Sequence, residues 1–207
     1  MCCVGIDVPE LCALVNKAGC RGVKFGESVE QNVEQWYAMR VTYQRELIAK
    51  RFLTERNIES FVPVRQERRL VGGRYCLKPR ALLHNYIFIH STREEIDNLK
   101  QFHLPYLRYV MHTQNGERQI MVVPEEQMRS FVIVAGSDDE RVMFLPSENA
   151  KLAKGERVRI LAGPFAGVEG VLAKVAGVRD RRVVVKIEGV AAVAAPTLPA
   201  EFVERIE

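Results

Sequence analysis

The sequence predicts an α+β fold, an antiparallel sheet with flanking helices followed by a small β domain. Two observations lead to this prediction. Between residues 35 and 135, segments that alternate every two residues are interleaved with segments of helical spacing, in the order β-α-β-β-α-β-β-α. From residue 152 to the end, short β-branched segments alternate with glycines, which is typical of strands joined by tight turns.

The composition is that of an ordinary globular protein. The chain has 207 residues, of which 47% are hydrophobic and 27% charged, and a net charge of +4. No apolar run approaches the about 20 residues that span a bilayer, and the first twenty residues lack the basic region of a secretory signal. We therefore expect a cytoplasmic protein, without membrane contact and monomeric.

The chain divides into four segments. Residues 1–34 form a leader to which the pattern assigns no role, and residues 35–135 carry the mixed α and β elements. Residues 136–151 are polar and broken by Gly, Asp and Pro, so they are interpreted as a linker with a weak apolar patch at 142–145. Residues 152–207 form the β domain. The five cysteines, at positions 2, 3, 12, 20 and 76, lack zinc-ligand spacing, so we expect no metal and no cofactor.

The elements of residues 35–135 follow from local patterns. Strands are expected at 36–41, 58–64, 81–90, 107–113 and 119–123. Helices are expected at 43–56, with Thr42 as N-cap and Asn57 ending it in the left-handed conformation, and at 92–101. Pro124 should open the last helix at its first position, and Met128, Phe131 and Val132 should form its apolar stripe.

A basic hairpin is expected at residues 64–80, with Gly72 and Gly73 at its tip. It holds six basic residues and one acid, Glu67, an excess of five positive charges (six minus one). Such charges are common on solvated loops, but at this density they repel each other, and a phosphate backbone would relieve the repulsion. We therefore favour nucleic acid as the partner of this set: Arg65, Arg68, Arg69, Arg74, Lys78 and Arg80.

The strand at residues 81–90 has two different faces. Leu83, Asn85, Ile87 and Ile89 alternate with His84, Tyr86, Phe88 and His90. The aliphatic face belongs in a core. The aromatic face has a composition enriched at protein interfaces, but it would equally suit a core beneath a second helical layer. Periodicity alone does not separate these alternatives.

Four motifs, in order, resemble the NusG family of transcription elongation factors across roughly residues 35 to 207. They are WYAMRVTYQRE at 36–46, HNYIFIHS at 84–91, VVP at 122–124, and a KOW motif running from Lys154–Val158 through Gly163–Gly167 to Gly170. His84 stands where the family usually has proline. Three stretches are more similar to specialised paralogues that act on capsular-polysaccharide operons than to the housekeeping factor: WYAMRVTYQREL at 36–47, ESFVPV at 59–64 and HNYIFIHS at 84–91.

The resemblance implies a fold, a function and sites. The last domain would be a five-stranded KOW β-barrel, and the first would grip the clamp helices of RNA polymerase through Tyr86, Phe88, Tyr109, Met128 and Phe131. The basic hairpin would meet DNA of the transcription bubble. The turn with Gly163, Pro164, Phe165 and Gly167 would present Phe165 outward to ribosomal protein S10 or the termination factor Rho. Alternatively, Phe165 would fold back as a lid over the barrel end.

The expected activity is transcription elongation and antitermination, without catalysis. His84 and His90 are about 20 Å apart along one strand, too far to share a metal, and no catalytic motif is present. A rival class is a KOW-type RNA-binding or ribosome-associated protein, but residues 152–207 have nine Lys/Arg against seven Asp/Glu, which is nearly balanced.

Residues 181–195 bear on a possible fold switch, since some specialised relatives refold their KOW domain as a helical hairpin over the polymerase surface. Six β-branched residues and Gly189 disfavour a helix here. We expect strands, a flexible connection between the domains and an open polymerase-binding surface.

Overall fold

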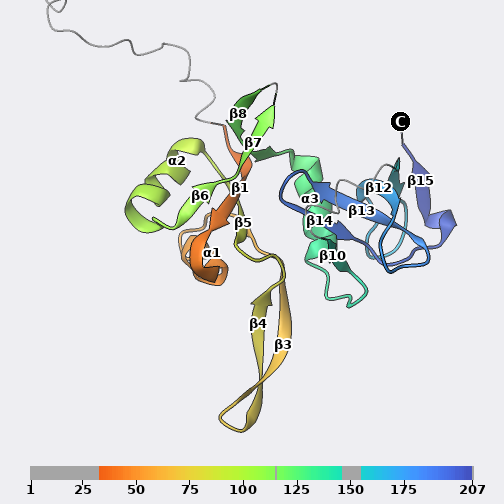
Figure 1. Ribbon diagram of the computed structural model, residues 1–207, viewed down its shortest axis with the longest axis horizontal. Coiled ribbons are helices and arrows are strands. Elements are labelled where there is room, and N and C mark those ends of the chain that lie inside the picture. Colours follow the sequence, from red (N-terminus) through yellow and green to blue (C-terminus); the bar gives the residue numbers. More distant parts are fainter. Residues whose placement is uncertain (1–32, 115, 146–154, 207) are drawn as a thin grey trace, which may run out of the picture.

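The computed structural model describes residues 33–114, 116–145 and 155–206. Two larger sheets make up most of it, with helix α3 (Glu125–Ala135) between them (Figure 1). Two hairpins project from the first sheet. Mixed α and β elements with antiparallel sheets confirm the expected class. Of the expected leader, residues 1–32 lie outside the described residues, and so do 146–151 of the expected linker.

The first sheet is antiparallel and is built around strand β1 (Gln35–Val41). The strand order is β2 (Ser60–Phe61), β5 (Tyr86–Ser91), β1 and β6 (Leu107–Tyr109), and β9 (Val122–Val123) also pairs with β1. Trp36 lies opposite His90 and Ala38 opposite Phe88, so their side chains share one face. Ile87 and Ile89 point to the other face, as their alternation predicted.

Helices cover both faces of this sheet. On one face, α1 (Glu46–Thr54) and α2 (Arg93–Asn98), which continues as a π-helical turn (Leu99–His103), bury Ala49, Leu53, Ile96 and Leu99 against the aliphatic side chains. On the other face, α3 buries Met128 and Phe131 against Phe88. The sheet is therefore a middle layer, and neither face is solvated along its centre.

Two helix starts differ from expectation. A short 3-10 turn (Thr42–Gln44) precedes α1, in which Tyr43 and Gln44 have φ of 62° and 51°. Thr42 therefore does not cap α1, which follows Arg45 and has no side-chain cap. Pro124 is the N-cap of α3 and not its first residue. Asn57, with φ of 57°, follows α1 in the left-handed conformation, as predicted.

The second sheet has six strands in the described residues. Its order is β10 (Met143–Leu145), β14 (Ala191–Ala194), β13 (Arg181–Ile187), β12 (Glu169–Lys174), β11 (Glu156–Ile160) and β15 (Val203–Arg205). Strands β11 to β15 match the five strands expected there, at 157–161, 168–175, 182–188, 190–195 and 202–206. Within the described residues, no pairing joins β10 to β15, so the expected closed five-stranded barrel is not found.

Strand β10 is the unexpected member of that sheet. It lies in the segment interpreted as a linker, and it pairs antiparallel with β14, Phe144 opposite Val193. Val142, just before it, is buried. The apolar patch at 142–145 was the visible sign of this strand, but three residues are too few for alternation to distinguish a strand from a short apolar turn.

Candidate functional site: a basic ribbon and a covered sheet face

The basic ribbon, β3 (Val64–Val71) and β4 (Arg74–Ala81), extends away from both sheets (Figure 1). Val71 pairs with Arg74, which leaves a two-residue turn of Gly72 and Gly73. Their φ values of 58° and 79° suit a type I′ turn, whose twist matches that of the strands and which glycine adopts without strain. The predicted hairpin and its tip are confirmed.

The register divides the ribbon into two faces, because residues opposite each other in an antiparallel pair point the same way. Pairs Arg65–Arg80, Glu67–Lys78 and Arg69–Cys76 share one face with Arg74, and this is called the basic face. Pairs Arg68–Leu77 and Leu70–Tyr75 share the other, called the aromatic face. Five of the six predicted basic residues therefore lie together, and Arg68 lies opposite them.

The basic face is only partly neutralised. Glu67 accepts hydrogen bonds from Arg69 at 3.1 Å and Arg80 at 3.2 Å, and chiefly the bond from Arg69 lowers the pKa of its carboxyl below the ordinary value. Arg74 and Lys78 are exposed and have no ion pair among the described residues. Arg65, at the base of the ribbon, is half-buried and so less accessible to a partner.

A polar pocket of about 420 Å³ lies at the base of the ribbon. Glu46, buried at the start of α1, accepts a 2.5 Å hydrogen bond from the backbone N–H of Asn85, and this joins α1 to the loop before β5. Sequence patterns did not single out this pocket, because its residues come from three separate segments. The residues that line it are Gln44, Glu46, Leu47, Arg69, Arg80, Ala81 and His84.

The five residues expected to grip polymerase do not form one exposed surface. Phe88, Met128 and Phe131 have 0% exposure and form the core between β5 and α3, with the rings of Phe88 and Phe131 5.4 Å apart. The expectation that they are exposed is wrong, and the core alternative holds. Their burial results from α3, whose contact with this face could not be seen in the periodicity of β5.

Tyr109 and Tyr86 lie on opposite faces of the sheet. Tyr109 is opposite Met39 in β6, which turns its ring toward Tyr37 and the α1–α2 side, and burial raises the pKa of its hydroxyl. Tyr86 remains half-buried on the α3 side, where its hydroxyl accepts a hydrogen bond from Arg40 at 3.3 Å. Of the predicted set, Tyr86 is therefore the one accessible member on the aromatic sheet face.

Phe165 folds back into the core of the second sheet, where it is 2% exposed. Gly163 and Gly167, with φ of 87° and 84°, reverse the chain on either side of it. Gly167 N–H then donates to the carbonyl of Ile160 at 2.7 Å, which closes the turn under the sheet. The expected outward presentation is wrong, because the ring folds back as in the alternative, here into the core of the open second sheet.

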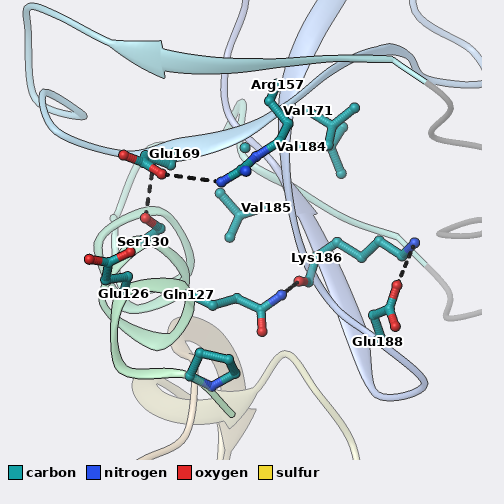
Figure 2. Close-up of a pocket in the computed structure, with 12 residues that line it drawn as sticks. Glu126, Gln127, Ser130, Arg157, Glu169, Val171, Val184, Val185, Lys186 and Glu188 are labelled. Carbon is teal, nitrogen blue, oxygen red and sulfur yellow. Dashed lines mark hydrogen bonds and ion pairs between the residues drawn. The ribbon is translucent and has the colours of Figure 1, made fainter. Parts of the chain in front are cut away.

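Helix α3 also contacts the second sheet, on the side away from Phe88. The Gln127 side chain donates to the carbonyl of Lys186 at 2.5 Å, and the buried Ser130 hydroxyl accepts from the N–H of Glu169 at 3.1 Å (Figure 2). A pocket of about 400 Å³ between α3 and strands β12 and β13 includes Arg157, paired with Glu169 at 3.7 Å. Strands at 181–187 and 191–194 are confirmed, but the expected open arrangement is not what the structure has.

Two absences concern the described residues only. No helix there is long and apolar enough to cross a membrane. No three His, Cys, Asp or Glu side chains of that part gather closely enough to hold a metal ion. Cysteines 2, 3, 12 and 20 lie outside it, and Cys76 is exposed on the ribbon.

A helix-covered antiparallel sheet that carries a basic ribbon defines the first half of the chain as an α+β domain with a cationic appendage. The family model described as "Transcription termination factor nusG" matches residues 34–132, so this part of the chain is similar to NusG-family domains. A solved structure, "Domain interaction in Thermotoga maritima NusG", is 20% identical and matches with a TM-score of 0.40, covering 84% of this chain and 98% of that chain. No curated protein sequence gives a significant match.

Proposed function

We propose that this chain is a transcription elongation factor that binds RNA polymerase and the nucleic acid of the transcription bubble, and that it promotes processive elongation and antitermination. The match of residues 34–132 to a NusG-family model carries the proposal. The basic ribbon supports its nucleic-acid part, because Arg74 beside its turn and Lys78 farther along β4 are exposed and have no ion pair among the described residues, and the ribbon projects from the sheet.

The polymerase contact is proposed to use the clamp helices of RNA polymerase and the aromatic sheet face around Tyr86. Helical hairpins dock into apolar grooves, and half-buried aromatics at the edge of such a groove provide contact area at low entropic cost. Phe88, Met128 and Phe131 would support this surface from beneath, as its core. Since the second sheet covers the opposite side of α3, polymerase binding through α3 itself would require the two to separate.

The second sheet, residues 152–207 with β10, is proposed to act as a KOW-type domain that recruits a further factor. Ribosomal protein S10 and Rho are the candidates. Because Phe165 is buried in the core of this sheet, such a partner would meet the outer surface of the turn at Gly163, Pro164 and Gly167, or else Phe165 would have to turn out. More specifically, the chain is proposed to act on capsular-polysaccharide operons.

The alternative is a KOW-type RNA-binding or ribosome-associated protein. In that class the second sheet would carry the nucleic-acid contact. Several charges on its strands instead pair with each other, among them Arg159 with Glu169 at 2.5 Å and Arg205 with Glu156 at 2.9 Å. Lys174 and Arg181 of this sheet are exposed without an ion pair in the described part of the chain, but residues 152–207 as a whole are nearly balanced in charge. The ribbon of the first domain has six basic residues against one acid, and this larger local excess favours the elongation factor.

Binding of the full chain to core RNA polymerase without nucleic acid tests the polymerase contact separately from the ribbon. We expect saturable binding that Tyr86→Ala weakens about tenfold or more, as is usual for an aromatic near the centre of an interface. Tyr43→Ala is the matched control, since Tyr43 is 82% exposed on a different loop. Equal loss in both variants, or no binding by the unaltered chain, would contradict the proposed contact.

A further inference from the structure

The aromatic face of the ribbon exposes large apolar side chains close to its tip. Tyr75 is 69%, Leu77 66% and Leu70 62% exposed, and all three lie on the same face by register. Toward the base the same face continues into the core, where Val64 is partly buried and Ala81 is buried. The apolar residues at the base of this face are therefore explained by packing in the core, whereas those nearer the tip are not.

Tyr75 is held in a defined position on this face. The guanidinium of Arg68 lies 5.1 Å from the centre of the Tyr75 ring, and Leu70 lies opposite Tyr75 in the ladder. A cation over one part of the ring and an aliphatic neighbour beside it limit the positions that the ring can take. The result is a restrained, exposed aromatic platform with a positive charge next to it.

The opposite face of the same two strands holds Arg65, Arg69, Arg74, Lys78 and Arg80 against the single acid Glu67, an excess of four positive charges (five minus one). One thin ribbon thus offers phosphate-binding cations on one side and an aromatic surface with one more cation on the other. Single-stranded nucleic acid matches both chemistries, because it carries phosphates and bare base faces together. A duplex keeps its base faces stacked and offers a side chain only the base edges.

We propose that the tip of the ribbon binds unpaired nucleic acid, with Tyr75 stacking on a base and the basic face contacting phosphates. This inference rests on the proposed function, from which it takes nucleic acid as the partner, and it adds the class that the ribbon selects. Leu70 and Leu77 border the stacked base, and Arg68 neutralises a phosphate on the aromatic side. A protein partner would be favoured by the leucines but not by the excess of cations on both sides.

The test measures binding of the full chain to a labelled oligothymidylate and to a duplex formed from the same strand and its complement. Tyr75→Ala should weaken single-strand binding about fivefold or more, the usual loss when one stacked base is deprived of its aromatic partner. Duplex binding should change much less. Tyr75→Phe is the matched control, because it keeps the ring and should bind the single strand as the unaltered chain does.

A second readout uses the fact that the chain has one tryptophan, Trp36, which is buried in the first sheet. In a Tyr75→Trp variant, the added indole is exposed, and stacking on a base should quench its fluorescence when the single strand is added. The unaltered chain gives the background from Trp36. Quenching by the single strand and not by the duplex supports the proposal.

Three results would overturn the proposal. They are unchanged single-strand affinity in Tyr75→Ala, an equal loss for single strand and duplex, or a loss of binding to core polymerase in Tyr75→Ala with single-strand affinity intact. The last would make the aromatic face a protein-binding surface. A double variant, Arg74→Gln with Lys78→Gln, distinguishes these results from a failure of the proposed function. If the double variant also binds both nucleic acids as the unaltered chain does, the ribbon does not bind nucleic acid at all.

Discussion

The basic ribbon and helix α3 differ in how well the exposure of their side chains can be predicted from the sequence. In the ribbon, strand register alone decides which side chains share a face, and most of them are exposed away from its base. In α3, five residues are buried, because one sheet lies on each side of the helix. The exposed side chains can therefore be predicted from sequence where an element packs against little else. They cannot be predicted where a segment from elsewhere in the chain covers the element.

The largest expected effect is on the free energy of unfolding, which should differ between a core variant and a ribbon variant. Phe131→Ala should lower the free energy of unfolding by about 3–5 kcal/mol, because it empties the space between Phe88 and Phe61 that its ring fills. Tyr75→Ala, at the exposed tip, should change it by less than about 0.5 kcal/mol. Denaturant unfolding of both variants measures the difference. Similar costs for the two would mean that Phe131 is not in a packed core.

The next effect concerns the charge of the ribbon. Replacing Arg68, Arg69 and Arg74 by Gln should weaken nucleic-acid binding and flatten its salt dependence, because fewer counterions are released. The slope of log affinity against log salt should fall by about 0.7 to 0.9 for each phosphate that the variant no longer neutralises. Replacing Arg179, Arg181 and Arg205 of the second sheet is the control and should leave the slope unchanged. A slope that survives the ribbon substitutions would mark these arginines as merely solvated.

A smaller effect tests the contact between α3 and the second sheet. Ser130→Ala leaves the N–H of Glu169 without its acceptor, which should cost about 1 kcal/mol of stability and speed amide exchange at Glu169. Arg129→Ala, exposed on the same helix, is the control. Hydrogen exchange at Glu169 that is already fast in the unaltered chain would mean that the second sheet is not docked in solution.

The smallest effect is a local titration just after α3. Hydrogen bonds from Arg141 lower the pKa of the half-buried Asp139 carboxyl to about 2. A lowered carboxyl pKa stabilises the fold above the ordinary value of 3.8, and that contribution disappears as the pH falls toward 2. Arg141→Ala should return the pKa toward 3.8, as read from carboxyl chemical shifts. A titration of Asp139 that is indifferent to this substitution would exclude the pair.

Much of the fold could be predicted because the information was local. The Gly72–Gly73 turn, the alternation in β5 and the β-branched strands β13 and β14 each depend on neighbours in sequence. The burial of Phe88 and Phe165, the placement of Tyr109 on the α1–α2 side and the pairing of β10 with β14 depend on segments far away. The family resemblance assigned Tyr86, Phe88, Tyr109, Met128 and Phe131 to one surface, but it could not show which of them the fold buries or turns to the other face.

The central claim is that this chain acts on transcribing RNA polymerase, and the affinity of the full chain for a reconstituted elongation complex tests it most directly. If the aromatic sheet face and the ribbon engage together, the chain should bind the complex more tightly than it binds either core polymerase or the bubble scaffold alone, since the second contact becomes intramolecular. Binding no tighter than to the scaffold would contradict the claim and favour a protein that binds nucleic acid independently of polymerase.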